Sequence, residues 1–474
     1  MDSENHKENP ITLVGKIEPI HNLKPAGWTK PLIFSSVAAS IGSFIFGFNI
    51  SVIDAPSQIF TQCDLESGLS GAFPTCINVH GYWNLVVTIF CIGGLIGSLS
   101  SSFLMSNIGR KATILYNCFF FMAGGLLMSL SSNLAMLLIG RLLIGFASGL
   151  VTCVVPTYLA EISPDTIRGQ VASFHQCMLV IGIIFAQALA FPLVTPGLQT
   201  WRILFFITAG LGCVQLICLF FAAESPVFLA SKRGIEHAEK SLKKLRGSKS
   251  IAEDLLRLQK RSSQSVFSSK PLSILELIPH KEARKSVLVS SFSHLAQQLS
   301  GINAYFFYCM IIFGSISLPF SPKVIPLILG IVNAAFSCGS VFLIDRSGRR
   351  PLLLLSTVIC CISTFCIVIG FLFGLTLLKV IPAITFVAGF AIGLGPVPWI
   401  IVGDIFPSEA ISSGSSLAIT VNWICNSLVA FGTEMLCSVL GPFAFLPFLA
   451  VLIAYLFFIL AYIPETKGTV PAYL

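Results

Sequence analysis

Twelve long apolar stretches constrain the fold of this chain more than any other feature. An α-helix needs about 20 mostly apolar residues to cross the hydrocarbon core of a bilayer. The twelve stretches lie near residues 30–53, 83–105, 112–130, 134–157, 169–193, 203–222, 286–312, 324–344, 351–374, 379–402, 413–436 and 442–463. Each run is continuous, whereas the strands of a membrane barrel alternate between apolar and polar residues. Because a backbone surrounded by lipid must satisfy its own hydrogen bonds, we predict an all-α membrane protein with twelve transmembrane helices.

The composition agrees with this prediction and excludes a soluble globular domain. Hydrophobic residues make up 55% of the chain and charged residues 11%, with a mean hydropathy of +0.87, whereas about a quarter of the residues of a soluble domain are charged. Residues 1–29 are polar and contain no cleavable signal sequence, so we expect the first helix to be retained.

The distribution of charge predicts how the spans are oriented. The loop 54–82 carries Asp54, Asp64 and Glu66 but no Lys or Arg, whereas the segment 224–285 holds 14 of the chain's 29 Lys and Arg residues. The positive-inside rule places the first segment outside and the second in the cytoplasm, and an even number of spans then puts both termini in the cytoplasm. The net charge of +8 requires no nucleic-acid partner, because a basic segment that faces anionic membrane lipids accounts for it.

Cysteine usage is mostly that of a membrane interior. Most of the fifteen cysteines lie within apolar runs, where cysteine acts as a small buried hydrophobe. Cys63 and Cys76 lie instead in the predicted external loop, and they would be able to pair if that loop faces an oxidising compartment. An external face of this kind favours the plasma membrane as the location.

Three short motifs recur at nearly one offset and indicate two related halves. The offsets are 239, 243 and 241 residues, and the pairs are Gly109-Arg110-Lys111 with Gly348-Arg349-Arg350, Glu161-Ile162-Ser163-Pro164 with Asp404-Ile405-Phe406-Pro407, and Glu224 with Glu465. Two six-helix halves of this kind are typical of transporters whose binding site lies at the interface of the repeats.

The repeat divides the chain into five segments. They are a cytoplasmic tail (1–29), an N-terminal six-helix half (30–223), a basic cytoplasmic linker (224–285), a C-terminal six-helix half (286–463) and a short cytoplasmic end (464–474). Within the linker, residues 232–262 have a helix-forming composition with leucines among the charges, which predicts a short helical layer, although a solvated linker remains an alternative.

Charged residues next to lipid are expensive, so each needs an explanation. Glu161 and Asp404 occupy the same position in the two halves, and basic residues follow the same pattern at Arg110, Arg349 and Arg350. We expect ion pairs among them to hold the two halves together on the cytoplasmic side, and the alternative is that they only anchor the helix ends. Arg141 lies within the fourth span, near its cytoplasmic end on a first count, but span counting alone cannot place both Arg141 and Glu161 at that end. The spacing from Glu161 to Arg168 fits the cytoplasmic loop.

Neutral polar side chains cluster in the second half. Amides and hydroxyls without charge suit an uncharged, polyhydroxylated ligand, and Gly301 provides a point at which a helix can break so that side chains turn inward. Trp399 and Trp423 offer flat faces for stacking on a ring, and Gln187 is better explained by helix packing. The cluster comprises Gln297, Gln298, Ser300, Asn303, Tyr305, Tyr308, Asn333, Asn422 and Asn426, with Gln176 in the first half.

In combination these residues resemble the sugar porters of the major facilitator superfamily, and among them the facilitative hexose carriers. The resemblance extends from Phe46-Gly47-Phe48-Asn49 to Pro464-Glu465-Thr466-Lys467-Gly468. Its further motifs are Gly140-Arg141, Pro156-x-Tyr158 with Glu161, Arg168-Gly169, Gln297-Gln298-Leu299-Ser300-Gly301-Ile302-Asn303, Asp345-Arg346-Ser347-Gly348-Arg349-Arg350 and Gly395-Pro396-Val397-Pro398-Trp399.

The resemblance implies a major facilitator fold that transports a hexose, glucose in the first place, by alternating access, without a cofactor. The sugar hydroxyls would be bound by Gln176, Gln297, Gln298, Asn303, Asn333, Trp399 and Asn426. An extracellular gate would include Phe306, Phe307 and Tyr308. A cytoplasmic gate would include Arg110, Glu161, Arg168, Asp345, Arg349, Arg350 and Asp404.

The chain departs from the animal facilitative carriers at Ala391, where they have an acid, at Phe307, where they have a tyrosine, and at Ile411, where they have an arginine. Proton-coupled members of the family typically carry an Asp at the position of Asn49, which cannot titrate, so uniport is favoured over proton symport. A non-transporting sugar sensor is a further alternative. The sequence contains neither a set of His and Cys residues at metal-binding spacing nor a phosphate-binding loop, so it does not favour an enzyme.

Overall fold

The computed structural model describes residues 27–61, 76–77, 79, 82–194, 198–247, 251–252, 254–256, 258–259, 274–307, 324–407, 410–467 and 474, and within these ranges its regular structure is entirely helical. The N-terminal half contains α1 (Lys30–Ser51), the short α2 (Ser57–Thr61), α4 (Trp83–Ile108), α5 (Arg110–Ser129), α6 (Leu134–Ile162), α7 (Arg168–Leu193) and α8 (Trp201–Phe221). The C-terminal half contains α13 (Arg284–Leu299), α14 (Ile302–Phe307), α16 (Val324–Ser347), α17 (Arg349–Leu372), α18 (Thr376–Ile392), α19 (Val397–Ile405), α20 (Ile411–Leu440) and α21 (Leu446–Tyr462).

The predicted spans correspond to these helices. Within the described ranges, ten helical segments are long and apolar enough to cross a membrane, with α18 and α19 counted as one of them. The shorter α21 and the broken pair α13 and α14 occupy the places of the two remaining predicted spans. The twelve-helix prediction therefore agrees with the fold, and this is a multi-pass membrane protein.

Two of the C-terminal spans are interrupted: the span formed by α13 and α14, and the span formed by α18 and α19. The span predicted at 286–312 breaks at Ser300 and Gly301, between α13 and α14. Gly301 has φ +89°, a left-handed conformation that a residue with a Cβ rarely adopts. The ring of Phe448 also lies against its Cα, so a Cβ would meet that ring at 2.9 Å. Glycine is therefore required where the chain changes direction beside the polar cluster.

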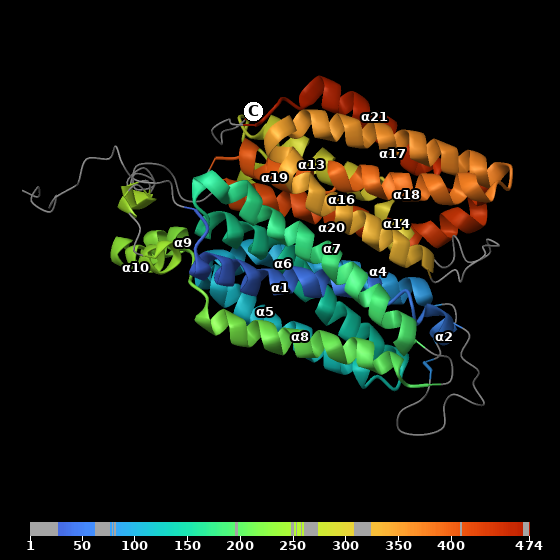
Figure 1. Ribbon diagram of the computed structural model, residues 1–474, viewed down its shortest axis with the longest axis horizontal. Helices are drawn as coiled ribbons and strands as arrows, with labels where there is room; N and C mark the ends of the chain where they lie inside the picture. The colour runs from blue at the N-terminus through green and yellow to red at the C-terminus, as the bar shows by residue number, and fades with distance from the viewer. Residues whose placement is uncertain are drawn as a thin grey trace, which may run out of the picture.

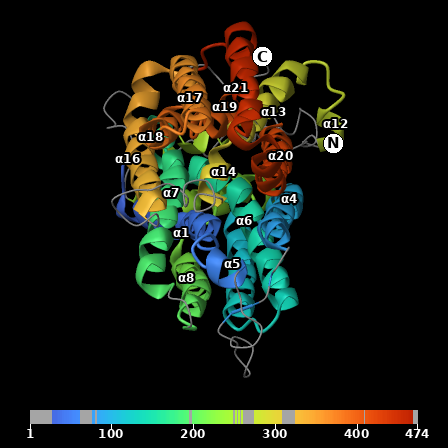
Figure 2. The ribbon, with the colours of Figure 1, turned by 90° about the vertical axis from the view of Figure 1, so that its right-hand side faces the viewer.

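The two halves lie side by side, as Figures 1 and 2 show. Two helix pairs make the main contact between them, α4 with α20 and α7 with α16. At the first pair, Trp423 of α20 packs on Gly94 of α4, and its Nε1 donates to Thr152 Oγ1 of α6 at 3.3 Å. Trp423 is only 1% exposed. The prediction that it offers a free face for stacking is wrong in this conformation, because its ring is occupied by packing against the other half.

Within the N-terminal half, small residues let helix backbones approach closely. Gly93 and Gly97 of α4 are spaced by four residues, as are Gly145 and Gly149 of α6, and the two pairs face one another. A Cβ on Gly97 would lie 2.1 Å from the carbonyl oxygen of Phe146. Paired small residues at this spacing are a common way for transmembrane helices to associate by van der Waals contact.

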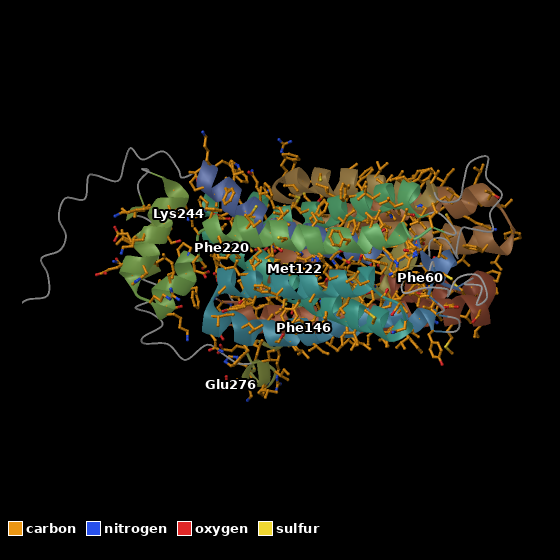
Figure 3. The ribbon with its side chains drawn as sticks, turned by 90° about the horizontal axis from the view of Figure 1, so that it is seen from below. Phe60, Met122, Phe146, Phe220, Lys244 and Glu276 are labelled. Carbon is orange, nitrogen blue, oxygen red and sulfur yellow. The ribbon has the colours of Figure 1, made fainter. Side chains whose placement is uncertain are left out.

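Parts of the described linker are helical, which agrees with the predicted helical layer. It contains α9 (Pro226–Lys232), α10 (Ile235–Arg246) and α12 (Ile274–Leu277). Figure 3 shows Lys244 of α10 and Glu276 of α12 at one end of the helical bundle, with Phe60 towards the other end. Arg246 Nη1 donates to the carbonyl oxygen of Ile162 at 2.7 Å, so α10 is bonded to the end of α6.

The contact between Gly94 and Trp423 yields a stability prediction. A Cβ added at Gly94 would lie 2.3 Å from Trp423, so Gly94→Ala should destabilise the protein by roughly 1–3 kcal/mol through overpacking. Gly210→Ala in α8 is the matched control: a Cβ there meets nothing within 4 Å, and alanine favours the helix. The melting temperature in detergent should fall for the first variant and stay equal or rise for the second. Equal stability of the two variants would contradict this packing.

Candidate functional site

A continuous network of amides joins the broken helix to α20. Asn422 is its centre: its Nδ2 donates to Gln297 Oε1 at 2.7 Å, and its Oδ1 accepts from Gln298 Nε2 at 2.9 Å. Asn303 Nδ2 extends the network, because it lies 2.6 Å from Gln298 Oε1 and 2.9 Å from Asn426 Oδ1. All five side chains are buried. The structure thus brings together four of the predicted ligand-binding residues, with Asn422 linking them.

The network is attached to the second broken span. Gln297 Nε2 donates to the carbonyl oxygens of Leu394 and Gly395 at 3.0 and 2.7 Å, at the turn between α18 and α19. Trp399 lies in α19, one helical turn beyond this point. The two interrupted helices therefore place backbone carbonyls, amides and one indole ring around a single region.

Two histidines flank Trp399. His294 lies edge-on to the indole with ring centroids 4.7 Å apart, and His175 of α7 lies 5.9 Å away on a different helix. His294 Nδ1 is 3.1 Å from Asn422 Nδ2, and His175 Nδ1 is 2.8 Å from Ser43 Oγ. Within the described part of the chain, neither Nε2 has a hydrogen-bond partner.

Sequence reasoning missed His294. The available signal was its position three residues before Gln297, which puts both side chains on one face of α13. With Trp399 it lines a cavity of about 30 Å³ between the halves, which also includes Thr152 and Ser415. Such a cavity accommodates water rather than a larger ligand, so the region is closed in this conformation.

Other predicted ligand and gate residues that the structure describes are not among the hydrogen-bonded members of the network. Asn333 of α16 accepts from Ser337 Oγ at 3.3 Å, and Gln176 of α7 is half-buried beside His175 in sequence. Phe306 is buried in α14. The side chains of Phe307 and Asp345, and all of Tyr308, lie outside the described residues.

In the described part of the chain, the acids of the two halves form ion pairs, and the pairs of Glu161 and Asp404 each lie within one half. Arg110 Nη2 donates to Glu161 Oε1 at 2.7 Å within the N-terminal half, and Arg349 Nε donates to Asp404 Oδ2 at 3.2 Å within the C-terminal half. Ser225 Oγ also donates to Glu161 Oε2. Ion pairs among the predicted residues therefore form, and in these two pairs each arginine contacts an acid of its own half. The lock between the halves stays a prediction.

Two further expectations about arginines are corrected. Arg350 Nη2 donates to the carbonyl oxygen of Leu460 at 2.9 Å, so the described contact of this guanidinium is with a helix end and not with an acid. Arg141 is fully buried two turns inside α6, in the half of the helix away from Glu161, and its guanidinium donates to the carbonyl oxygens of Asn49 and Val86. It ties α1 and α4 to α6 and does not belong to the layer of ion pairs.

Carboxylates cap equivalent helix N-termini in the two halves. Glu224 Oε1 accepts from the backbone N–H of Lys111 at 3.0 Å, and Glu465 Oε1 accepts from that of Arg349 at 2.9 Å. Partial burial opposes the charged form of Glu465, but donation from neighbouring backbone N–H groups outweighs it and holds the pKa of this carboxyl below its usual value. Each acid therefore stabilises the positive end of a transmembrane helix.

The segment after α1 differs in part from its predicted character. Asp54 is buried, and burial raises the pKa of its carboxyl to about 8, which weakens its contribution to an acidic outer loop. Cys76 is disulfide-bonded, which agrees with a cysteine in an oxidising environment. Cys63, Asp64 and Glu66 lie outside the described residues.

Two six-helix halves, interrupted helices and a buried polar network beside their interface define a membrane carrier of the major facilitator fold. Residues 35–470 match the family model described as "Sugar (and other) transporter", and the chain belongs to this family. It is 34% identical to the facilitated glucose transporter member 4 of solute carrier family 2 from Bos taurus, over 93% of this chain and 89% of that protein. It is 33% identical to member 1 from Gallus gallus, over 93% and 92% of the two chains.

A solved structure of the proton:xylose symporter XylE, bound to 6-bromo-6-deoxy-D-glucose, shares the fold. Its TM-score is 0.79 at 20% sequence identity, and the alignment covers 93% of this chain and 97% of that chain. At this level of identity the similarity establishes the architecture, and the function has to be argued from the residues of the site.

The ion pairs yield a prediction that distinguishes two roles: each pair stabilises its own half, or the pairs together hold the two halves in contact. Glu161→Gln and Asp404→Asn should each lower the melting temperature, because a hydrogen bond to a charged group contributes roughly 1.5–3 kcal/mol. The effects should add in the double variant to within about 0.5 kcal/mol, since the two acids bond to different residues, Glu161 to Arg110 and Ser225 and Asp404 to Arg349 and Thr466. Thermal unfolding of the four proteins in detergent measures this. A strongly non-additive double variant would instead support a lock that couples the halves.

Proposed function

We propose that this protein carries out facilitative transport of a hexose, glucose in the first place, by alternating access. The amide network of Gln297, Gln298, Asn303, Asn422 and Asn426 carries the proposal, because it is a buried, uncharged set of donors and acceptors in a membrane carrier. An amide offers both a donor and an acceptor, which suits the hydroxyls of a neutral sugar. Family membership and the glucose-transporter relatives support the same substrate class. The proposal includes no catalytic residue.

The bonds among the amides set the expected affinity. Without sugar the amides satisfy one another, so none is left buried without a partner. A bound sugar would replace these bonds by bonds to its own hydroxyls, and each exchange contributes only about 1 kcal/mol net. A modest total, near the −4 kcal/mol of a millimolar dissociation constant, suits a carrier that has to release its substrate.

Alternating access would use the contacts between the halves. The proposed sugar site comprises the network residues together with Gln176, Asn333 and Trp399, and the interrupted spans beside it can change shape without breaking long helices. Phe306, Phe307 and Tyr308 would close its extracellular side. The ion pairs of Glu161 and Asp404, with Arg168 and Asp345 nearby in sequence, would keep the cytoplasmic end of each half rigid while the halves move.

Asn49 favours uniport over proton symport. Its side chain is fully buried, donates through Nδ2 to the carbonyl oxygen of Ile45 at 2.8 Å and accepts at Oδ1 from Thr208 at 3.3 Å. A neutral amide makes both bonds and does not titrate in the physiological pH range. Coupling requires that the binding of a proton changes the affinity for the sugar, and Asn49 offers no site for that proton.

The proposed membrane is the plasma membrane, with both termini and the linker 224–285 in the cytoplasm. The linker's 14 Lys and Arg residues support this orientation. The disulfide-bonded Cys76 supports an external face for the opposite end.

The first test removes single amides. Gln298→Ala and Asn303→Ala should each reduce radiolabelled glucose uptake at least tenfold in cells that lack other hexose carriers, because each leaves network partners buried without a bond. Gln187→Ala is the matched control, since Gln187 lies against Gly330 outside the network and its loss should leave uptake near normal. Surface expression of each variant is measured in parallel. Normal uptake by both network variants would remove these residues from the site.

The second test concerns Asn49. The unmodified protein should bring the internal and external sugar concentrations to equality at any external pH, because no proton moves with the sugar. Asn49→Asp should make uptake depend on pH, since it places a carboxyl that can gain and lose a proton in the buried part of α1. Uptake into proteoliposomes between pH 5.5 and 8 measures both proteins. Accumulation against a gradient by the unmodified protein, abolished by a protonophore, would overturn uniport.

A further inference from the structure

The hydrogen bonds of the amide network run in one direction, which two backbone carbonyls set. Gln297 Nε2 lies 3.0 and 2.7 Å from the carbonyl oxygens of Leu394 and Gly395, and a carbonyl oxygen only accepts hydrogen bonds. The amide of Gln297 cannot be turned round, because its own oxygen would then face these two oxygens. Gln297 Oε1 therefore points to Asn422, which has to present its NH2 group there, at 2.7 Å.

The same requirement passes along the network. With its NH2 group on Gln297, Asn422 turns its Oδ1 to Gln298 Nε2 at 2.9 Å. Gln298 Oε1 then accepts from Asn303 Nδ2 at 2.6 Å, and Asn303 Nδ2 also lies 2.9 Å from Asn426 Oδ1. A half-turn of any one of these amides would set two donors or two acceptors against each other. The break between α18 and α19 thus fixes the orientation of every amide in the network.

This direction also determines the tautomer of His294. An amide nitrogen carries two hydrogens, and one of those on Asn422 is directed to Gln297. The other is directed to His294 Nδ1, 3.1 Å away, so Nδ1 has to accept and a neutral ring carries its hydrogen on Nε2. The carbonyl oxygen of His294 lies 3.5 Å from the same nitrogen, which is long for a hydrogen bond, so it does not replace the ring.

Packing holds the ring of His294 in place. His294 is fully buried, and its ring lies edge-on to Trp399 with centroids 4.7 Å apart. It stands three residues before Gln297 on α13, so both side chains reach Asn422 from one face of that helix. The acceptor of the ring is therefore presented to Asn422 in a fixed position.

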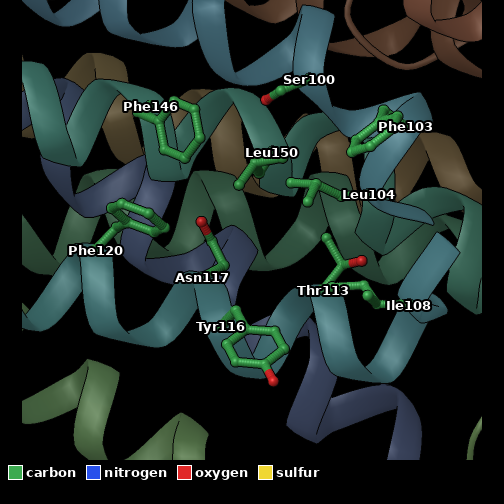
Figure 4. A pocket seen from close by; sticks show the side chains of 10 residues that line it. All are labelled: Ser100, Phe103, Leu104, Ile108, Thr113, Tyr116, Asn117, Phe120, Phe146 and Leu150. Atoms are coloured by element: carbon green, nitrogen blue, oxygen red, sulfur yellow. The ribbon is translucent and has the colours of Figure 1, made fainter.

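A buried amide outside the network shows what His294 supplies. Asn117 of α5 is 1% exposed, and Figure 4 shows it among mainly apolar and aromatic side chains. Its Nδ2 donates to the carbonyl oxygen of Ala147 at 3.1 Å, but its Oδ1 accepts no hydrogen bond from the described part of the chain. Burial alone therefore does not provide an amide with all of its partners in this fold. Asn422 has a short bond for each of its hydrogens because His294 lies beside it.

We propose that His294 is a positioning residue of the sugar site. Its Nδ1 accepts from Asn422 and so keeps the amides of the network in the orientation that receives the sugar. His294 does not touch the sugar in this role, because it acts through Asn422. The role rests on the proposed function, since the amides that it orients are those proposed to bind a hexose.

The position of the bond indicates which kinetic constant depends on it. Without the ring acceptor, one N–H of Asn422 is buried with no short bond, so Asn422 rotates towards another acceptor and Gln298 loses the oxygen to which it donates. The sugar then binds less tightly. The helix pairs that join the halves, α4 with α20 and α7 with α16, do not include His294, so the movement of the halves should proceed at its normal rate. A rise in KM with little change in kcat is the expected result.

Three substitutions separate the acceptor at Nδ1 from the rest of the ring. In His294→Asn the amide oxygen is as many bonds from the backbone as Nδ1, so it supplies an acceptor at the same place. In His294→Gln the oxygen is one bond further away, near the position of Nε2. His294→Leu supplies no acceptor. Ser290→Ala is the matched control, because Ser290 lies one turn earlier on α13, is also buried, and donates to the carbonyl oxygen of Val287 in its own helix.

The test measures the initial rate of glucose uptake into proteoliposomes against glucose concentration. KM should rise about tenfold in His294→Leu and His294→Gln, because each leaves Asn422 without the acceptor at Nδ1. KM should stay within about twofold of normal in His294→Asn and Ser290→Ala, and kcat within about twofold in all four variants. An unchanged KM in His294→Leu would refute the positioning role. So would a KM in His294→Asn as high as that in His294→Leu, because the acceptor would then not be what matters.

A second measurement requires no transport. Nitrogen-15 NMR of the full-length protein, labelled at its seven histidines, distinguishes a ring nitrogen that carries hydrogen from one that does not. The signals absent from His294→Leu, or from His294→Gln if the first variant fails to fold, identify His294. We expect hydrogen on Nε2 and none on Nδ1. Hydrogen on Nδ1 would overturn the positioning role, whereas hydrogen on Nε2 in a protein that moves no hexose would support the tautomer and refute the proposed function alone.

Discussion

The structure depends on a constraint set by the bilayer: every backbone group in the hydrocarbon core must be bonded within its own helix, so helices attract one another mainly by close packing. In the N-terminal half this packing is achieved by glycines that face neighbouring backbones, such as Gly97 against Phe146 and Gly145 against Phe90. The same device joins the halves, where Trp423 fits on Gly94. Larger residues at these positions would separate the helices that position the polar network.

Polar side chains within this packed interior obtain their hydrogen bonds from other groups of the protein. The amides of the network bond to one another, and the guanidinium of Arg141 bonds to the carbonyl oxygens of Asn49 and Val86. A network that is closed in this way can exchange its internal bonds for bonds to a ligand at little net cost, which suits reversible binding.

Several features of the fold could be predicted from the sequence because they depend only on residues that are close together along the chain. The spans, the break at Gly301 and the helical linker were predicted correctly, since apolar length, a glycine beside polar residues and leucines among charges are local properties. The ion pairs Arg110–Glu161 and Arg349–Asp404 also belong to the predicted set, but the sequence did not assign each arginine to one acid. The repeat placed Glu161 and Asp404 at equivalent positions, but it gave no information on whether their arginines belong to the same half or to the opposite one.

The order of the amino acids was enough to establish a twelve-helix membrane protein in two related halves with neutral amides in the second, because helix length, hydropathy and motif spacing do not depend on distant contacts. The roles of particular side chains required the folded chain. Trp423 became a packing residue, His294 joined the site, and Asn117 was left with a free acceptor, because each outcome depends on distances between helices that lie far apart in sequence. Those distances follow from how the helices pack together.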